Sequence, residues 1–297
     1  MNIFYYHIID FLSLIYYQLK LILPFWLGGI ILGGILSAYF SERIGNLMDK
    51  LKEYKHQYVA ILLGSILGAI SPITMHGMVP IVLLFYKQRM PQSILTSFII
   101  TSVLINPNVF FYSFALGVDI ALLRLFFTIL TGYIGGLLVM FFLKNKDIFT
   151  FSSQKNNGIS NKSKHQTALQ SMLKTIKKTL PYLLIGILLT ALFEKYIPKN
   201  ILENVFTNNQ GLGAIFGSAL GVPLYFCGGG SIALILSWMN HGMSTGSVVA
   251  FVIAGPATKI NNITAIAAMA KKKYVALYLA YILSFSAIAG ILIDFIQ

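Results

Sequence analysis

Residues 223–231 read Pro223-Leu224-Tyr225-Phe226-Cys227-Gly228-Gly229-Gly230-Ser231, and they interrupt an otherwise apolar segment, 212–239. Proline removes a backbone donor and glycine weakens a helix, so this run predicts two short helices in place of one long helix. The earlier apolar segment 59–86 is interrupted in the same way, by Ser71-Pro72-Ile73-Thr74-Met75-His76-Gly77-Met78-Val79-Pro80. In a membrane, such irregular backbone is tolerated only where protein or a water-filled cavity satisfies it. The breaks therefore indicate a polar site in the interior of the fold.

The composition is that of a polytopic membrane protein. Of the 297 residues, 57% are hydrophobic and only 10% are charged, and the mean hydropathy is +0.76. Soluble domains carry about 25% charged residues, so this chain has too few charges to cover a globular surface. Secreted, fibrous, disordered and cytosolic-enzyme classes are excluded. The single cysteine, Cys227, excludes an internal disulfide framework and a paired-cysteine metal site.

A second pair of breaks follows the first pair at a fixed spacing. Segments 93–117 and 246–270 are interrupted by Asn106-Pro107-Asn108 and by Gly255-Pro256-Ala257-Thr258-Lys259-Ile260-Asn261-Asn262. Shifting the chain by 153 residues superposes 64–142 on 217–295 without a gap. The identical pairs include Gly64/Gly217, Ser65/Ser218, Gly68/Gly221, Gly77/Gly230, Met90/Met243, Phe98/Phe251 and Asn108/Asn261. Internal repeats with interrupted segments at corresponding positions point to the binding site of a transporter.

Basic residues distinguish two topologies for the broken segments 59–86 and 212–239. Each segment could cross as a discontinuous helix, or enter and return as a re-entrant hairpin. With two hairpins, 17 of the 22 Lys and Arg residues lie on the cytoplasmic side, 4 lie outside, including Arg124, and Lys259 lies within the membrane. With eight simple spans the count is 11 inside and 10 outside. Cytoplasmic loops carry the excess of Lys and Arg, so the hairpin topology is favoured.

We therefore predict an all-α polytopic membrane protein with two inverted repeats, each of three spans plus one re-entrant hairpin; eight simple spans are the alternative. Residues 1–143 form the first membrane repeat, 144–178 a basic cytoplasmic linker, and 179–297 the second membrane repeat. The first span is expected at 21–40. Segment 3–18, which contains an aspartate and many aromatic residues, is expected to be an interfacial helix. We expect a multi-pass protein of the cell membrane.

Lys259 is the sharpest single candidate for the site, because it lies near the middle of segment 246–270. Buried charge in a span is costly and is functional by default. Polar and small residues at the four breaks complete the predicted substrate-binding set. The set is Thr74, Met75, His76, Gly77, Asn106, Asn108, Cys227, Gly228, Gly229, Gly230, Ser231, Lys259, Asn261 and Asn262. The helix after the second break is expected to begin near Ser231, which could cap it.

The predicted site has no acidic group, because all nine Asp and Glu residues lie at segment ends or in loops. A hard divalent cation requires oxygen anions, so we expect no metal and no cofactor. Lys259 gives the site a positive charge, which favours an anionic or neutral polar solute. The chain has no GxxxxGK[ST], HExxH or GxSxG motif, so we expect no enzyme activity. The net charge of +13 orients the chain in the bilayer and does not indicate a nucleic-acid partner.

The motif regions resemble a predicted permease family that includes the ArsP-type organoarsenical exporters. The resemblance covers nearly the whole chain and is weakest at 144–178. It implies a membrane permease, with efflux of arsenicals or soft metals known among relatives. Family members often carry a cysteine where Thr74 stands here, and that cysteine would pair with Cys227. With a single thiol, this chain is expected to bind trivalent arsenic more weakly. The residues that carry the resemblance are 71–81, Ile105-Asn106-Pro107-Asn108, 221–232 and 255–260.

The function predicted from the sequence is secondary transport of a small anionic or polar solute by alternating access. An elevator-type movement in a homodimer is one form that this mechanism could take. The alternatives are efflux of trivalent organoarsenicals or soft metals and, from another class, a channel or a membrane subunit that needs a partner docking on 144–178. The substrate, the coupling ion and the direction of transport are left open by the sequence.

Overall fold

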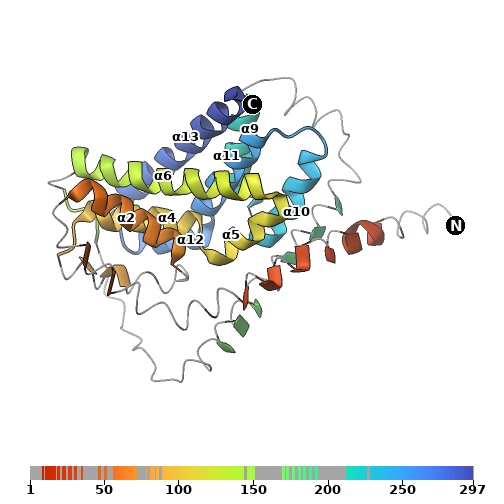
Figure 1. Cartoon of the computed structure of the whole chain (residues 1–297), viewed down its shortest axis with the longest axis horizontal. Helices are drawn as coiled ribbons and strands as arrows, with labels where there is room; N and C mark the ends of the chain where they lie inside the picture. The colour runs from red at the N-terminus through yellow and green to blue at the C-terminus, as the bar shows by residue number, and fades with distance from the viewer. Residues whose placement is uncertain are drawn as a thin grey trace.

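The structure is a computed structural model. It describes residues 56–71, 89–143, 146–150, 212–225 and 228–296 without gaps, and single residues or short groups elsewhere between 9 and 192. For Pro223, Gly228, Gly229 and Asn261 it describes the backbone only. The helices are α2 (Gln57–Ile70), α4 (Gln92–Leu104), α5 (Pro107–Ser113), the 3-10 turn η1 (Phe114–Leu116), α6 (Val118–Phe142), α9 (Leu212–Leu224), α10 (Gly228–Met239), α11 (Thr245–Thr258), α12 (Ile260–Ala267) and α13 (Lys272–Ile296) (Figure 1).

The described part of the chain is helical, as predicted. Its only extended pairing is an isolated bridge between Phe149 and Ala270. Within this part, three helices are long and apolar enough to cross a membrane, namely Phe11–Gly28, Val118–Phe142 and Lys272–Ile296. The pair Gln92–Leu104 and Pro107–Leu116 also qualifies when taken together, with a bend of 44°.

The first long helix corrects a boundary predicted from the sequence. Its range, Phe11–Gly28, runs across the division expected between an interfacial helix at 3–18 and a span at 21–40. The polar residues near that division include Lys20, which is exposed and lies within the helix. Lysine is a good helix former, so it does not end a helix whose neighbouring turns are apolar.

Large apolar side chains on the outside of the long helices suit a lipid environment. Phe126 on α6 is 59% exposed and Phe295 on α13 is 90% exposed. Such side chains follow both helices along their length, whereas charged residues are absent from their outward faces except near the ends. Lipid tails satisfy apolar side chains without a penalty, so this surface fits a multi-pass membrane protein.

Four helices recur in the same order in the described chain: α2, α4, α5 and α6 correspond to α9, α11, α12 and α13. Shifting α4, α5 and α6 by 153 residues reproduces the bounds of α11, α12 and α13 to within one residue. The packing is also repeated, because α4 contacts both α2 and α6, and α11 contacts both α9 and α13. The two sets of helices meet through contacts of α11 with α4 and α6, and of α10 with α5.

Glycines bring the paired helices close together at corresponding places in the two sets. A side chain added at Gly68 would lie 2.6 Å from the Phe98 carbonyl oxygen, and one added at Gly221 would lie 3.1 Å from the Phe251 carbonyl oxygen. One turn earlier, Gly64 and Gly217 approach the carbonyl oxygens of Ile94 and Ser247. Small residues four apart allow helix backbones to pack closely in membranes.

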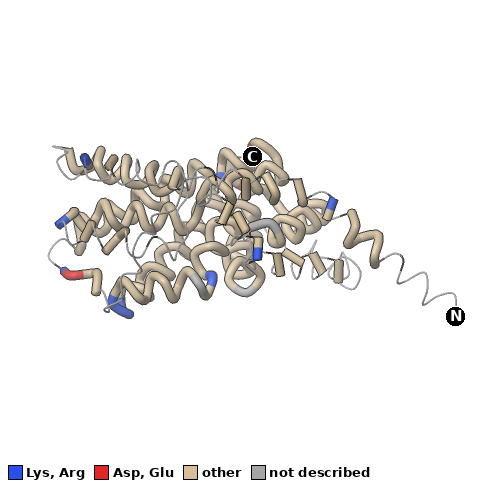
Figure 2. Tube along the Cα trace, turned by 90° about the horizontal axis from the view of Figure 1, so that it is seen from below, with Lys and Arg blue, Asp and Glu red and all other residues tan. Residues whose placement is uncertain are grey.

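Hydrogen bonds bring several helix ends together at one end of the molecule. Gln57 Nε2 donates to Ser93 Oγ at 3.4 Å, so α2 and α4 begin side by side. The Ile148 N–H donates to Gln92 Oε1 at 3.0 Å, and the Lys271 N–H donates to the Ile148 carbonyl at 3.1 Å. Basic residues gather at this end, on the left of Figure 2, and others are scattered along the molecule.

The start of α11 lies at the opposite end. Asp294, in the last turn of α13, accepts hydrogen bonds of 2.8 Å from Ser244 Oγ and from the Gly246 N–H. A helix of 25 residues such as α13 is about 37 Å long, so these contacts are a membrane thickness away from the Ile148–Lys271 contact. Because Gly217 faces Ser247, α9 begins at this second end and runs beside α11 in the same direction.

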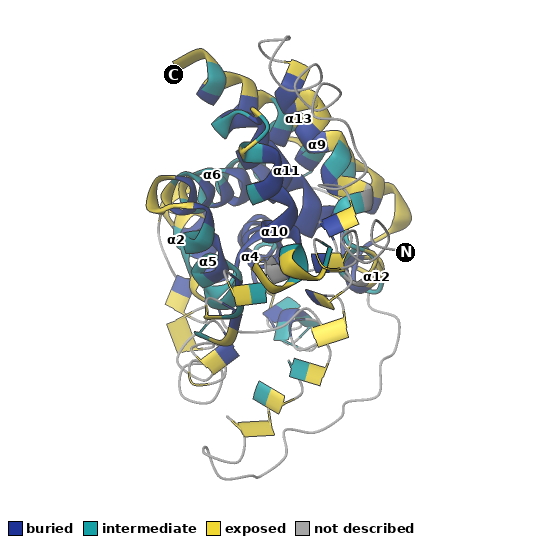
Figure 3. Ribbon diagram, turned by 90° about the vertical axis from the view of Figure 1, so that its right-hand side faces the viewer, coloured by how far each residue is buried: buried dark blue, intermediate teal, exposed yellow. Residues whose placement is uncertain are grey.

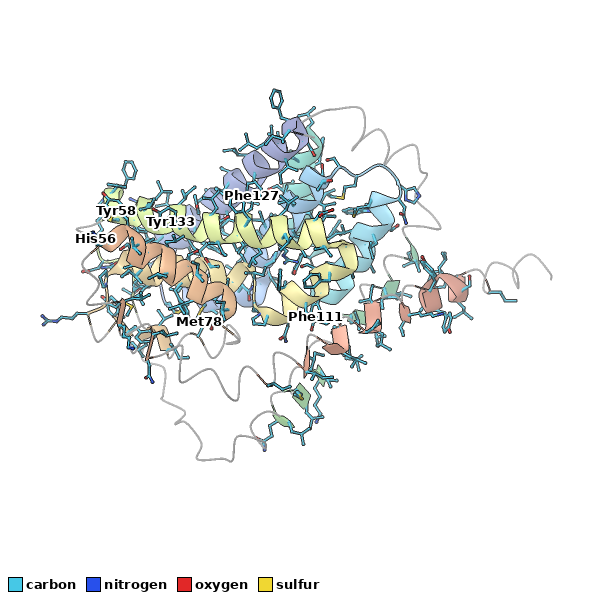
Figure 4. All side chains as sticks on the ribbon, viewed as in Figure 1. His56, Tyr58, Met78, Phe111, Phe127 and Tyr133 are labelled. Atoms are coloured by element: carbon cyan, nitrogen blue, oxygen red, sulfur yellow. The ribbon has the colours of Figure 1, made fainter. Side chains whose placement is uncertain are left out.

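The described residues after α2 lead back to the end where α2 begins. Met78 is fully buried and its sulfur accepts a hydrogen bond of 2.7 Å from Ser102 Oγ, near the far end of α4. Tyr86 then packs edge-on against Phe149, with ring centroids 5.9 Å apart, at the end where Ile148 contacts Gln92. Figure 4 labels His56 and Tyr58 at one end of α2 and Met78 near its other end.

The core is centred on α4 and α11. Every residue of α11 from Gly246 to Thr258 is buried, and α4 is buried on nearly all sides. Figure 3 shows both helices in dark blue in the middle of the bundle. A helix buried all round has no lipid-facing stripe, so the polar groups at the broken ends of these two helices must be satisfied inside the protein.

Candidate functional site

The break between α4 and α5 is held by Asn106. Its side-chain Oδ1 accepts a hydrogen bond of 3.0 Å from the Val109 N–H, and Pro107 occupies the first helical position, which needs no donor. Asn106 therefore caps α5, and Asn108 lies half-buried in the same first turn. The cap explains why the sequence carries asparagine followed by proline here. A role of either asparagine in solute binding stays a prediction.

The break between α11 and α12 lies at Lys259. This residue is extended, it is half-buried, and its carbonyl accepts hydrogen bonds from Asn262 N (2.8 Å) and Ile263 N (3.0 Å) at the start of α12. Asn262 Nδ2 donates to the Pro256 carbonyl at 2.7 Å, replacing the helical partner that the break removes. Thus Asn262 stabilises the broken backbone on which Lys259 is presented.

Tyr225 connects the end of α9 with this second break. It is buried, and its ring packs against Gly255, where an added side chain would collide with the ring carbons. Its ring centroid is also 6.2 Å from that of Phe251. Gly255 stands one helical turn before Lys259, so the residue that follows α9 lies next to the α11 break.

The start of α10 differs from the sequence prediction. The helix begins at Gly228, three residues before the expected start near Ser231, so the prediction that Ser231 caps it is wrong. Ser231 and Gly230 are buried within the first turns of the helix. Packing of α10 against α5 and α11 compensates for the low helix propensity of glycine.

Arg124 is a central polar residue that sequence reasoning missed. The two-hairpin topology predicts Arg124 outside the membrane, but the residue lies six residues into α6 and is fully buried. Its Nη1 donates to Ser113 Oγ at 2.9 Å, and its Nη2 approaches the Tyr225 hydroxyl at 3.4 Å. Both contacts are with neutral hydroxyl groups. The sequence carries no local signal for this burial, because the start of the helix at Val118, six residues before Arg124, is seen only in the structure.

Two polar atoms on the same helix have no hydrogen-bond partner among the described residues. They are Arg124 Nε and the hydroxyl oxygen of Thr128, and both residues are fully buried. Residues four apart lie on one face of a helix, so both atoms belong to one side of α6. Buried polar groups without a partner are rare in folded proteins.

Part of the predicted site falls outside these observations. Thr74, Met75, His76, Gly77 and Cys227 lie outside the described residues. Gly228 and Gly229 lie in the first turn of α10 and Asn261 in the first turn of α12, with only their backbones described. The structure thus locates Asn106, Asn108, Gly230, Ser231, Lys259 and Asn262 at the breaks. Their binding roles stay predictions.

Comparison with known proteins identifies the family. A family described as "Predicted permease" matches residues 7–295. The chain belongs to this permease family. The family resemblance proposed from its motifs is therefore confirmed. Within the described residues, no group of three or more His, Cys, Asp or Glu side chains could hold a metal ion.

Two relatives of this permease match over shorter stretches. The UPF0718 protein YcgR of Bacillus subtilis (strain 168) is 31% identical over 93 residues, which is 31% of this chain and 30% of that protein. A Streptococcus mutans serotype c protein, named "Putative two-component membrane permease complex subunit", is 35% identical over 95 residues, 31% of this chain and 30% of that protein. The matched stretches thus span less than a third of each relative. No solved structure matches the permease at a significant level.

Proposed function

We propose that this permease is a secondary transporter of the cell membrane, which moves a small anionic or polar solute by alternating access. The observation that carries the proposal is that α4 and α11, the two most buried helices, contact each other and are both interrupted at corresponding positions. Interrupted helices inside a membrane protein expose backbone groups and helix ends that can bind a solute.

The proposed architecture is a pair of inverted repeats, each with a re-entrant hairpin. It is supported by the contacts at the helix ends. The chain from α2 to α4 returns to the end where Gln57 meets Ser93. The helices α9 and α11 begin at the other end, where Ser244 meets Asp294. Two hairpins entering from opposite ends would bring their tips together between the broken helices.

This arrangement offers two cationic groups to the solute. Lys259 lies at the α11 break, and Arg124 contacts Tyr225, which packs one turn before that break. A positive interior fits an anionic or polar solute better than a cation. Alternating access would then follow if α9 and α10, with Tyr225 between them, move against the α6 wall that contains Arg124.

Two alternatives remain part of the proposal. Efflux of trivalent organoarsenicals or soft metals is suggested by the ArsP-type resemblance, although Cys227 is the single thiol of the chain. A role as the membrane subunit of a larger complex is suggested by the name of the Streptococcus mutans relative. In that case the basic segment 144–178 is our candidate for the docking surface of the partner.

The proposal is tested by solute flux into proteoliposomes that contain the purified permease. A panel of small carboxylates, phosphate, methylphosphonate, neutral polar solutes and trivalent organoarsenicals is compared with and without pH and Na⁺ gradients. We expect flux of at least one anionic or polar solute, abolished in Lys259→Ala and retained in the matched surface variant Lys272→Ala. Flux of organoarsenicals alone would favour the first alternative. Wild-type flux that Lys259→Ala leaves unchanged would contradict the site.

A further inference from the structure

Within the part of the chain that the structure describes, no ion pair compensates the charge of Arg124. The guanidinium is fully buried roughly 9 Å along α6 from the helix start. It contacts two hydroxyl groups, those of Ser113 and Tyr225, and neither carries a charge. Burying an ionised group without an anion is strongly unfavourable, so a residue retained in this state is expected to meet an anion during function.

The free hydrogen-bonding groups indicate where that anion would bind. Among the described residues, Arg124 Nε is buried and has no hydrogen-bond partner, and the same is true of Thr128 Oγ1, one turn further along the same face of α6. The Nε–H group and one neighbouring N–H of a guanidinium point the same way, and this fork fits two oxygens of a carboxylate or phosphate group. The threonine hydroxyl, one helical turn away on the same face, is a further donor.

The two hydroxyl contacts orient the guanidinium. Ser113 Oγ donates to the Val109 carbonyl at 2.8 Å, so its lone pair is available to accept from Arg124 Nη1. Tyr225 is held against Gly255 and approaches Nη2. Each Nη carries two N–H groups, so one contact on each still leaves the Nε–H and a neighbouring Nη N–H available for an anion.

We propose that Arg124 and Thr128 bind an oxyanion group, a carboxylate or a phosphate-type group, of the solute that the permease transports. This inference rests on the proposed function and specifies its substrate class, since an uncharged arsenical or a metal cation has no use for this site. Tyr225 belongs to the second set of helices. Binding of an oxyanion by Arg124 would therefore also affect the contact between α6 and the residue that follows α9.

A structural role for Arg124 predicts a different result from an anion-binding role. If Arg124 served only to tie α5 and α9 to α6, replacing it with methionine would lower the melting temperature. If the charge of Arg124 instead serves to bind an anion, Arg124→Met replaces an uncompensated buried charge by an apolar side chain. In chloride, without acetate or phosphate, the Tm of this variant then equals or exceeds that of the wild type.

The test measures the Tm of the detergent-purified permease in chloride, acetate and phosphate at equal ionic strength. We expect acetate or phosphate to raise the wild-type Tm by about 2–4 °C relative to chloride. This shift should disappear in Arg124→Gln and Arg124→Met, fall in Thr128→Val and persist in Arg89→Gln, whose arginine lies in an exposed turn. Equal Tm values in the three salts, or an equal shift in Arg124→Gln, would overturn the inference.

The same experiment separates this inference from the proposed function. It needs no transport, so an Arg124-dependent shift in a protein without any flux would support the oxyanion site and count against transport. Conversely, flux of a neutral solute that Arg124→Gln leaves unchanged, together with no anion shift, would retain the transporter and overturn the oxyanion site. A lower Tm of Arg124→Met in chloride would assign Arg124 a structural role and overturn it as well.

Discussion

Arg124 Nη2 lies 3.4 Å from the hydroxyl oxygen of Tyr225, although the two residues are 101 positions apart in the chain. One belongs to α6 and the other follows α9, so this contact joins the two sets of helices deep in the bundle. It lies one turn from the α11 break that presents Lys259. The buried charge, the end of α9 and the interrupted helix are therefore parts of a single region, and solute binding there would affect all three.

The hydroxyl group of Tyr225 can be tested without disturbing its packing. Tyr225→Phe keeps the ring against Gly255 and removes one contact of Arg124. A hydrogen bond to a charged group contributes about 1.5–3 kcal/mol, and a 3.4 Å contact is expected to give less, about 1 kcal/mol. We expect KM for the solute to rise about fivefold with little change in Tm. Tyr58→Phe, on the exposed side of α2, is the matched control; equal KM values in both variants would contradict the role of the hydroxyl.

Asn262 is predicted to stabilise the broken backbone. Its side chain donates to the Pro256 carbonyl at 2.7 Å, so Asn262→Ala would leave this carbonyl without that partner. The expected loss is about 1–3 kcal/mol in the free energy of unfolding, measured by thermal or denaturant unfolding in detergent. Asn240→Ala, in an exposed turn, should have no effect. A stable Asn262→Ala variant with reduced flux would instead indicate that this amide contacts the solute.

Gly68 and Gly221 are predicted to be equivalent packing positions. Alanine at Gly68 would place Cβ 2.6 Å from the Phe98 carbonyl, and alanine at Gly221 would place it 3.0 Å from the Gly255 nitrogen. Both helices must separate to accept the methyl group, at a cost of about 1–3 kcal/mol. Both variants should show lower yields of monodisperse protein by size-exclusion chromatography, with Gly68→Ala the more severe. Val222→Ala, whose native side chain is 45% exposed, is the control.

Asp294 is predicted to anchor the start of α11. Its two oxygens accept from Ser244 Oγ and the Gly246 N–H, where a carboxylate also interacts favourably with the helix N-terminus. Asp294→Ala should lower the free energy of unfolding by about 1–3 kcal/mol, and Asp294→Asn by less, because one acceptor remains. Asp119→Asn, in the exposed first turn of α6, is the matched control. Unfolding midpoints unchanged in Asp294→Ala would show that these bonds are dispensable.

The sequence predicted the periodic parts of the fold well. The spacing of 153 residues, inferred from Gly68/Gly221 and similar pairs, recurs in the helix bounds and in the glycine contacts. Proline and asparagine at Asn106-Pro107 correctly marked the end of α4, because a proline cannot continue the hydrogen-bond ladder. These signals are local, so they can be interpreted without knowledge of the tertiary contacts.

Tertiary contacts account for what the sequence did not predict. Hydropathy tolerates one arginine near a helix end, and nothing local distinguishes a buried Arg124 from one that reaches the membrane surface. Its burial depends on Ser113 and Tyr225, which the folded chain brings to it. Similarly, the glycines at 228–230 suggested a loop, but packing against α5 and α11 makes them helical.

The opposed orientation of the two sets of helices is the claim on which the site depends, and single-cysteine labelling tests it directly. Cysteine is introduced at Lys272 or at Asn240 in a Cys227→Ser background, and labelling by a membrane-impermeant maleimide is compared in intact cells and inverted vesicles. Both positions are exposed in the structure. We predict that Lys272→Cys is labelled only from the cytoplasmic side and Asn240→Cys only from outside. Labelling of Lys272→Cys from outside and of Asn240→Cys from the cytoplasm would establish eight simple spans and contradict the account.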